Sequence, residues 1–355
     1  MENNNSVKVF RPVSLTEDLD RYTDTFMTAF WPNSEDVEVI RQWLRHDFEK
    51  EVVAKLAAPS HRCDWRINAL GVGTGDGSMD EIIIEKLRLY FGKVRYTAVE
   101  PGKVIEQFEH RVHNSIDLKA TEFSWKNMTY EDFCRSETKH SRKFTFISLI
   151  HSAYYFDDIQ ESLRSLMGSL EKGGALLIIV NRGWLFMPLH VPGGARHEFD
   201  THESCRPRAI HPTSHTPHEL DTKTDKANES NSGQTRPTND NDLETFLSSL
   251  SWKTKNTQSR RVEEIQAFAA SENIPLATYL LSARINVTSC FDESSEEGDK
   301  LLDFLTETAY LRRTAPTSVL RETLDVLKMV SKEDEEGMRY FCTACDAMLL
   351  FKETD

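Results

Sequence analysis

The chain has 355 residues, of which 43 are Lys or Arg and 57 are Asp or Glu, so its formal net charge is -14 at pH 7. This length allows a substantial core, and the acidic balance argues against general binding to nucleic acid, because no surplus of cations exists to neutralise phosphates. The polar start lacks an apolar signal segment and no apolar run approaches about 18 residues, so we expect a cytoplasmic protein that contacts no membrane.

Residues 66–181 alternate between apolar runs and segments with helical spacing, which is typical of a parallel sheet covered by helices on both faces. Asp157 or Asp158 can cap the last of these helices, and Lys172-Gly173-Gly174 ends it. We therefore predict a Rossmann-like doubly wound α/β sheet. The predicted strands are 67–72, 94–99, 122–125, 144–150 and 175–180, and the predicted helices are 79–90, 104–112 and 159–170.

The first strand runs into a turn with glycine at alternate positions, namely Gly71, Gly73 and Gly75. Glycine has no Cβ, so the backbone can turn tightly and approach a ligand closely. Glu100 ends the second strand, where a carboxylate can accept hydrogen bonds from both hydroxyls of a ribose. The turn does not match the Gly-x-Gly-x-x-Gly fingerprint of dinucleotide-binding sites, because Asp76 and Ser78 occupy the two positions where its third glycine could stand. The turn therefore indicates a nucleoside cofactor and disfavours an NAD-dependent oxidoreductase.

The segment 191–242 is rich in Thr, Ser, His, Pro, Asn and Asp and has few aliphatic residues. It cannot bury enough apolar surface to offset its ordering entropy, so we interpret 191–250 as a disordered polar insertion. Its histidines and Cys205 lack tight ligand spacing, and we expect no metal site.

The C-terminal part returns to ordered patterns. We predict helices at 243–250, 262–270, 301–308 and 318–329, and strands at 276–287 and 340–351 that form an antiparallel hairpin at the sheet edge. The expected organisation is an N-terminal helical lid over 1–60, an α/β core over 61–190, the insertion over 191–250, and the remainder of the same domain, with acceptor-binding elements, over 251–355.

Several segments together resemble the histamine N-methyltransferase family over most of the chain. They are the glycine turn, Val99-Glu100-Pro101, residues 147–155, Gly183-Trp184, residues 298–308 (GDKLLDFLTET) and Thr314-Ala315-Pro316. The resemblance implies a class I methyltransferase fold, S-adenosylmethionine (SAM) as cofactor, a small-molecule amine as partner, and no need for a second subunit. The insertion has no counterpart in the family.

The resemblance assigns cofactor contacts to the glycine turn (Gly71, Gly73 and Gly75) and to Glu100, which would bind the ribose. Ile150 resembles the residue that packs on the adenine side. Thr129 or Tyr130 lies where the family places a small polar adenine contact, and Ile105 stands where the family has a glutamine.

The resemblance also assigns an acceptor site, in which the carboxylate of Glu35 would meet the ammonium of an amine. Without the resemblance, we would interpret Glu35 as a capping carboxylate in the first turn of a helix, where it interacts favourably with the helix dipole. His151 replaces a family glutamine and Thr343 a family asparagine, and His151 could also be structural. The other assigned acceptor residues are Tyr22, Phe26, Tyr154, Tyr155, Trp184, Phe304 and Glu307.

Methyl transfer from a sulfonium is a direct displacement that depends on positioning, so we expect no catalytic acid or base. An imidazole is largely neutral near pH 7, because its pKa is about 6.5, and it is then a competent nucleophile. Aromatic faces would stack on the acceptor and attract the sulfonium. The sequence thus predicts an N-methyltransferase for histamine or a related imidazole or aromatic amine. Carnosine-like dipeptides or other biogenic amines are alternatives, and a catalytically silent SAM-binding scaffold is the alternative of another class.

Overall fold

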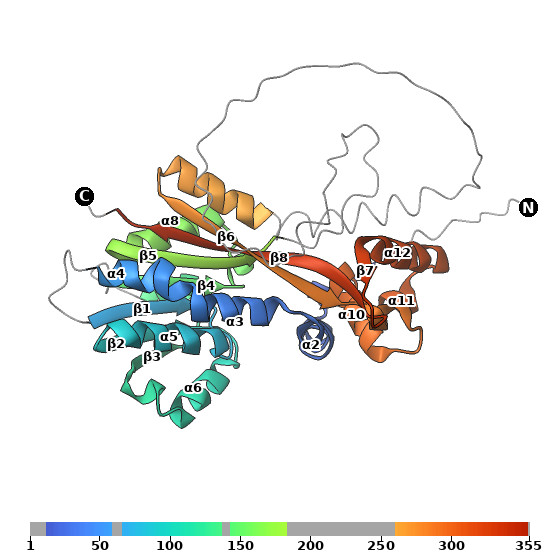
Figure 1. The fold of residues 1–355 in the computed structure, drawn as a ribbon, viewed down its shortest axis with the longest axis horizontal. Coiled ribbons are helices and arrows are strands. Elements are labelled where there is room, and N and C mark those ends of the chain that lie inside the picture. Colours follow the sequence, from blue (N-terminus) through green and yellow to red (C-terminus); the bar gives the residue numbers. More distant parts are fainter. Residues whose placement is uncertain (1–11, 59–65, 137–142, 183–259, 354–355) are drawn as a thin grey trace, which may run out of the picture.

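The computed structural model describes residues 12–58, 66–136, 143–182 and 260–353. Within them the strands form one sheet in the order β3-β2-β1-β4-β5-β8-β6, and β7 pairs with β8 off this path (Figure 1). The strands are β1 (Arg66–Val72), β2 (Lys93–Val99), β3 (Glu122–Lys126), β4 (Phe144–Ile150), β5 (Leu170–Asn181), β6 (Leu276–Asn286), β7 (Ser331–Glu333) and β8 (Arg339–Phe351).

Strands β1 to β5 are parallel, and β8 lies antiparallel between β5 and β6. This arrangement is the Rossmann-like doubly wound sheet that was predicted. The antiparallel pair formed by β6 and β8 is also present, although residues 287–338 join its strands in place of a short turn. Because β8 is inserted inside the sheet, β6 alone forms that edge.

The end of the helix that follows β4 differs from the prediction. Asp158 caps it, since its side chain accepts a hydrogen bond of 2.9 Å from the Glu161 amide. The helix ends at Ser169, and Leu170 already pairs with Phe144 at the start of β5. Gly173, with φ of +70°, lies where the register of β5 shifts, so these glycines form an irregularity inside a strand and do not end a helix.

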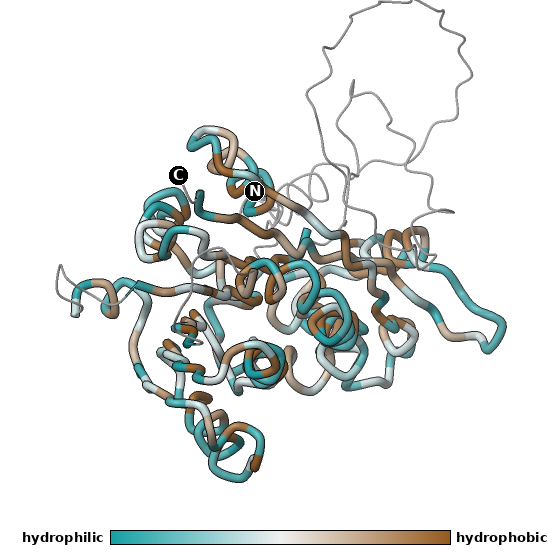
Figure 2. The backbone as a smooth tube through the Cα atoms, turned by 60° about the vertical axis from the view of Figure 1, so that its left-hand side comes forward, coloured by the Kyte–Doolittle hydropathy of each residue, from teal (hydrophilic) through white to brown (hydrophobic). Residues whose placement is uncertain are grey.

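Helices cover both faces of the sheet. On one face, α3, α4 and α5 bury Leu44, Leu56 and Ile83 against the sheet, and α6 packs Phe108 against Tyr96 of β2 and against the rings of β3. On the other face, α7, α8 and the helix over 260–271 bury Phe133, Leu163 and Phe268. Their bounds are α3 (Asp36–His46), α4 (Ala54–Ala57), α5 (Ser78–Tyr90), α6 (Ile105–Asn114), α7 (Tyr130–Ser136) and α8 (Ile159–Ser169). Figure 2 shows hydrophobic residues concentrated on the strands and on the inner sides of these helices.

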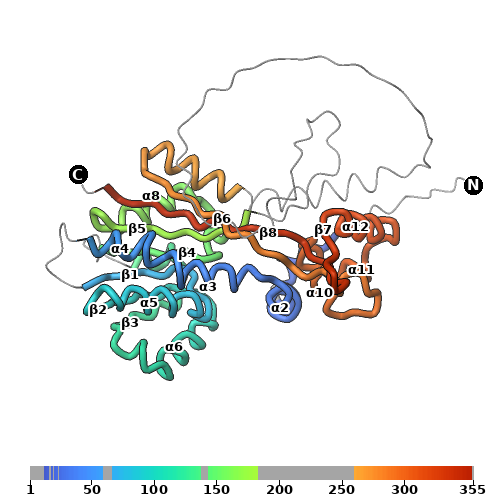
Figure 3. Tube along the Cα trace, in the orientation of Figure 1, coloured from blue at the N-terminus to red at the C-terminus, as the bar shows by residue number. Residues whose placement is uncertain are grey.

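A third core lies beyond the sheet, where the far ends of β6 and β8 meet helices from both ends of the chain. It joins Ala29 and Phe30 to Ile285, Leu302 and Phe341. In Figure 3 the N-terminal segment lies beside α10. The elements are η1 (Leu15–Glu17), α1 (Leu19–Thr25), η2 (Phe26–Phe30), α2 (Trp31–Asn33), α10 (Glu296–Thr306), α11 (Leu311–Thr314) and α12 (Thr317–Val330).

The described residues of the predicted N-terminal lid contribute to two of these cores. Residues 12–33 pack in the third core, whereas α3 and α4 pack on a face of the sheet. Among the described residues, no helix is long and apolar enough to span a bilayer.

Candidate functional site

The glycine turn adopts a backbone that requires glycine. Gly73 and Gly75 have φ of +69° and +54°, and the Gly73 amide donates a 2.8 Å hydrogen bond to the Val99 carbonyl at the end of β2. A Cβ on Gly73 would overlap Ser152, whereas a Cβ on Gly75 would meet no atom within 4 Å. The turn is thus packed on one side and open at Gly75, where a ligand can approach the backbone.

Glu100 is fixed beside this turn by two backbone donors. Its Oε2 accepts from the Gly75 amide at 3.1 Å, and its Oε1 accepts from the Gly102 amide at 2.7 Å. Each carboxylate oxygen keeps a lone pair that can accept from a ribose hydroxyl. The Thr74 Oγ1 is buried and has no hydrogen-bond partner in the described part of the chain. An open backbone, an oriented carboxylate and an orphaned hydroxyl fit the nucleoside part of SAM.

A buried pair beneath the turn was missed by sequence reasoning. The Tyr96 hydroxyl donates to Asp80 in the first turn of α5, and a Cβ on Gly71 would overlap both groups. Burial raises the pKa of Asp80 to about 7 and raises that of Tyr96 as well. Gly71 is therefore required by packing on this pair, which forms the floor of the turn. A polar residue on the apolar second strand was the only available signal.

The remaining predicted cofactor residues lie around this turn in different environments. Ile150 is half-buried at the end of β4, and Ile105 is buried at the start of α6. Thr129 is exposed and caps α7, because its Oγ1 accepts from the Asp132 amide at 3.1 Å. Tyr130 is buried and its hydroxyl lies 3.1 Å from Ser165. Contact of these residues with the adenine stays a prediction.

The structure brings most of the predicted acceptor wall together. The rings of Tyr22, Phe26 and Phe304 lie 5.7 to 6.5 Å apart between centroids. The Tyr22 pKa is raised by burial first and then by the neighbouring Tyr155 and Glu307. Tyr155 is 73% exposed and forms the outer edge of this wall. The aromatic wall thus joins the third core to the loop that follows β4.

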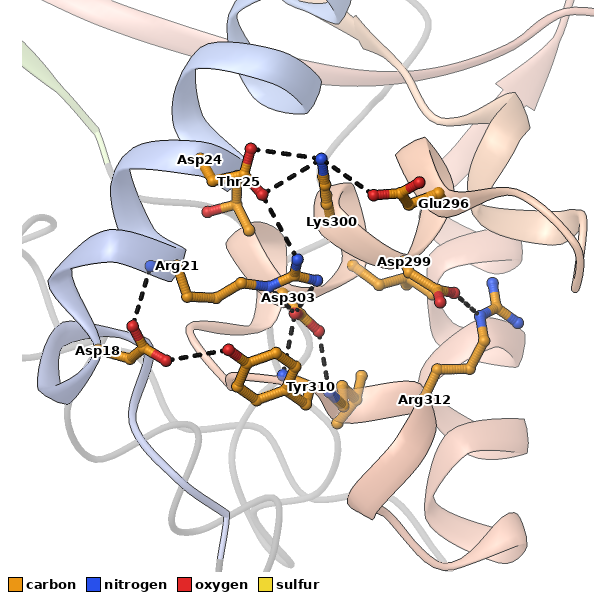
Figure 4. A network of polar contacts seen from close by, with 12 residues as sticks. Asp18, Arg21, Asp24, Thr25, Glu296, Asp299, Lys300, Asp303, Tyr310 and Arg312 are labelled. Carbon is orange, nitrogen blue, oxygen red and sulfur yellow. Dashed lines mark hydrogen bonds and ion pairs between the residues drawn. The ribbon is translucent and has the colours of Figure 1, made fainter.

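A buried ion pair between Arg21 and Asp303 joins α1 to α10 (Figure 4). The Arg21 Nε and Nη2 donate to Asp303 Oδ2 at 2.9 and 2.6 Å, and the Tyr310 and Leu311 amides also donate to this carboxylate at 2.9 Å. Burial raises the Asp303 pKa, and the bound Arg21 opposes this effect. Each partner precedes an aromatic wall residue in the sequence, so the pair fixes the N-terminal helix against α10. Lys300 adds ion pairs to Asp24 and Glu296.

We expect Arg21→Met to lower the free energy of unfolding by about 2 kcal/mol, because Asp303 would lose two charge-assisted hydrogen bonds while staying buried. Urea denaturation measures this change. Arg135→Met is the control, since its ion pair with Asp132 is exposed and we expect less than about 0.5 kcal/mol. Equal losses in the two variants would contradict the supporting role of Arg21.

His151 and Tyr154 form a second part of the site, at the end of β4. His151 has φ of +52°, its amide donates to the Ile179 carbonyl at 2.9 Å, and its Nδ1 lies 3.3 Å from the Tyr154 hydroxyl. The Asn181 amide donates to the same hydroxyl. Burial lowers the His151 pKa to about 4, so the ring is neutral near pH 7.

The two neighbouring carboxylates Glu35 and Asp36 differ in burial and in their partners. Glu35 is half-buried, with 40% of its side chain exposed, and forms an ion pair with Arg284, at 2.6 Å between Oε1 and Nη2. Asp36 is 4% exposed, and its Oδ1 has no hydrogen-bond partner in the described ranges. Burial, and then the Asp36 carboxylate, raise the pKa of the Cys345 thiol, and Asp36 also contributes to the raised Tyr154 pKa. Asp36 is thus the carboxylate that lies near Tyr154.

Glu35 was assigned through the resemblance, and neither its ion pair with the distant Arg284 nor the burial of Asp36 could be read from the sequence. The only signal for Asp36 in the sequence was its place beside Glu35.

Thr343 lies on β8 opposite Ala283, on the same face as Cys345. Its Oγ1 is buried and, within the described residues, has no hydrogen-bond partner. An orphaned hydroxyl on the same face of β8 as Cys345 is consistent with the predicted acceptor contact. Trp184 lies outside the described residues, as does the insertion 191–250. In the part of the chain that the structure describes, no cluster of His, Cys, Asp and Glu could hold a metal ion.

Comparisons with known proteins agree with this geometry. A family model described as "Methyltransferase domain" matches residues 42–228. Histamine N-methyltransferase of Danio rerio is 27% identical over 320 residues, which cover 89% of each chain. The enzyme of the same name from Xenopus tropicalis is 26% identical with the same coverage. Carnosine N-methyltransferase 2 of Gallus gallus is 24% identical over 87% of this chain and 84% of that protein. The similarity thus extends over nearly the whole chain.

Proposed function

Because this chain belongs to the methyltransferase domain family and uses SAM as its methyl donor, we propose that it transfers the methyl group to a nitrogen of histamine or of a related imidazole or aromatic amine. The observation that carries this proposal is Asp36, a buried carboxylate with an oxygen that no described residue satisfies. A buried carboxylate of this kind favours a cationic partner. A primary ammonium would supply both the charge and the hydrogen bonds.

The aromatic wall supports a flat acceptor. Tyr22, Phe26 and Phe304 present ring faces and edges that can pack on an imidazole or aryl ring. The same rings attract cations through their negative faces. An acceptor with one flat ring and one ammonium therefore matches the two parts of the site.

The chain performs the reaction by positioning. When bound, SAM supplies a methyl group on a sulfonium, which a neutral nitrogen lone pair can attack directly. Glu100 and the amide of Gly75 orient the nucleoside end. Asp36 holds the acceptor by its ammonium, and the aromatic wall excludes water and fixes the ring, so that the reacting nitrogen approaches along one direction. Since no proton must be removed before attack, the site needs no strong base.

The test is to incubate the protein with methyl-labelled SAM and a panel of histamine, carnosine and aryl ethylamines, and to locate the label by mass spectrometry. We expect label on nitrogen in one of these amines. Carnosine belongs in the panel because a carnosine N-methyltransferase is among the relatives. Measured SAM binding without label on any amine would contradict the proposal and favour a silent cofactor-binding scaffold.

A further inference from the structure

His151 lies between the cofactor turn and the predicted acceptor residues. The next residue, Ser152, packs against Gly73 of the cofactor turn and donates 2.7 Å to the Val72 carbonyl. Tyr154 and Tyr155, three and four residues on, belong to the acceptor side. The left-handed backbone of His151, at φ of +52°, is uncommon for a residue other than glycine and is concentrated at functional sites.

The hydrogen bonds of Tyr154 determine which His151 nitrogen carries the proton. The Tyr154 oxygen already accepts from the Asn181 amide, so its own O–H needs an acceptor. The nearest acceptor that the structure gives it is His151 Nδ1, at 3.3 Å. If Nδ1 carried the proton, the buried Tyr154 O–H would lose this partner, which is costly. In a neutral imidazole the remaining proton is then on Nε2.

We propose that His151 is a specificity-determining residue that presents a fixed Nε2–H donor to the acceptor. This proposal rests on the proposed function, and it narrows the acceptor to an amine that turns a lone pair toward His151. Such a group is an aza nitrogen, a carbonyl oxygen or a carboxylate oxygen. An acceptor that turns a ring N–H toward His151 would place two donors against each other and leave both unsatisfied.

The low pKa of His151, about 4, supports a donor that stays neutral throughout the physiological range. A charged ring would also offer Nε2–H, but its Nδ1 would then be a donor toward Tyr154. Neutrality therefore keeps the hydrogen bond from Tyr154 in place, and that bond keeps the tautomer fixed.

The first test needs no acceptor. In protein with ¹⁵N-labelled histidine, NMR distinguishes the protonated from the unprotonated ring nitrogen, and loss of one signal in His151→Gln assigns it among the 12 histidines. We expect Nε2–H in the unaltered protein and a mixture of tautomers in Tyr154→Phe. Tyr90→Phe, which removes a hydroxyl bonded to Glu49 far from the site, is the control and should not change the signal. Finding Nδ1–H in the unaltered protein would overturn the proposal.

The second test compares two amines by calorimetry in the presence of S-adenosylhomocysteine. 2-(1H-Pyrrol-2-yl)ethylamine has a ring N–H and no basic ring lone pair, whereas 2-(pyridin-2-yl)ethylamine has a ring lone pair and no N–H. We expect the pyridyl amine to bind about tenfold more tightly, and His151→Gln to abolish this preference, because an amide can turn either its oxygen or its NH₂ to the ligand. A preference for the pyrrolyl amine, or a preference for the pyridyl amine that His151→Gln leaves intact, would refute the inference. Failure of both amines to bind, with Nε2–H observed by NMR, would count against the proposed function alone.

Discussion

Asp36→Asn is expected to raise the Michaelis constant for an amine acceptor about 100-fold while leaving the dissociation constant of SAM unchanged. The variant removes the charge that would pair with the acceptor ammonium in a buried site, where loss of such a partner typically costs about 2–5 kcal/mol. Steady-state kinetics with the acceptor found by labelling, together with calorimetric SAM titration, measure the two effects separately.

Glu35→Gln is the matched control, because it removes a carboxylate one residue away that Arg284 already neutralises. We expect less than a threefold change in acceptor affinity, since an exposed ion pair contributes roughly 0–1 kcal/mol. If Glu35→Gln impairs the acceptor and Asp36→Asn does not, the original assignment of Glu35 is correct and our proposal for Asp36 fails.

The same residue predicts how activity and stability depend on pH. Burial raises the Asp36 pKa from 3.8 to about 6, so kcat/KM for an amine should fall as the pH drops through about 6 and the carboxylate is protonated.

The free energy of unfolding should change with pH in the opposite direction. The native state binds this proton more tightly than the unfolded state, so the contribution is complete below pH 3.8 and is lost as the pH rises through 6. Asp36→Asn should therefore increase the free energy of unfolding at pH 7 by about 1–2 kcal/mol. Urea denaturation between pH 4 and 7 checks this, and a destabilised variant would argue against an unpaired carboxylate.

Glu100→Gln is expected to weaken SAM binding about 100-fold. The carboxylate accepts from the amides of Gly75 and Gly102, and an amide NH₂ in its place would face one of these donors with another donor. The variant thus disturbs the ribose contact and the turn that carries Gly75. Calorimetry with SAM measures the loss, and a smaller SAM-dependent rise in melting temperature gives an independent check.

Glu109→Gln is the control for this effect, since Glu109 is exposed on α6 and carries the same charge near the same turn. It should leave SAM affinity within about twofold, because exposed charges are screened by solvent. A similar loss in both variants would show that the general negative charge of this region matters and not the two hydrogen bonds of Glu100.

Most of the fold was predictable because its signals are local. The run 144–150 is apolar and matches β4, and the polar residues that follow contain the cap of α8 at Asp158. The end of α8 was not predictable, since Leu170 has a helical position in the pattern but pairs with Phe144, 26 residues before it. Strand pairing outweighs helix propensity there. The position of β8 inside the sheet likewise depends on pairing with both β5 and β6.

The acceptor site was likewise predicted only in part. The aromatic wall was identified through the resemblance, and the structure brings Tyr22, Phe26 and Phe304 together. The ion pair that fixes this wall was not identified, because Arg21 and Asp303 are 282 positions apart. The ion pair of Glu35 with the distant Arg284 and the burial of Asp36 were not identified either. These contacts join segments far apart in the chain, so the residues nearby in sequence do not indicate them.

The sequence by itself determined the class of fold and indicated a nucleoside cofactor, because the glycine turn and Glu100, 25 residues after Gly75 at the end of the next strand, form one local unit; the resemblance then specified SAM. Only the tertiary structure decided which of the two carboxylates is buried and which group lies beside Nδ1 of His151, and our proposals for the acceptor site follow from these facts. Both depend on desolvation and on partners brought from distant segments. Asp36 is buried and one of its oxygens has no partner among the described residues, Glu35 is paired with Arg284, and the Tyr154 hydroxyl, which accepts from the Asn181 amide, lies beside Nδ1 of His151.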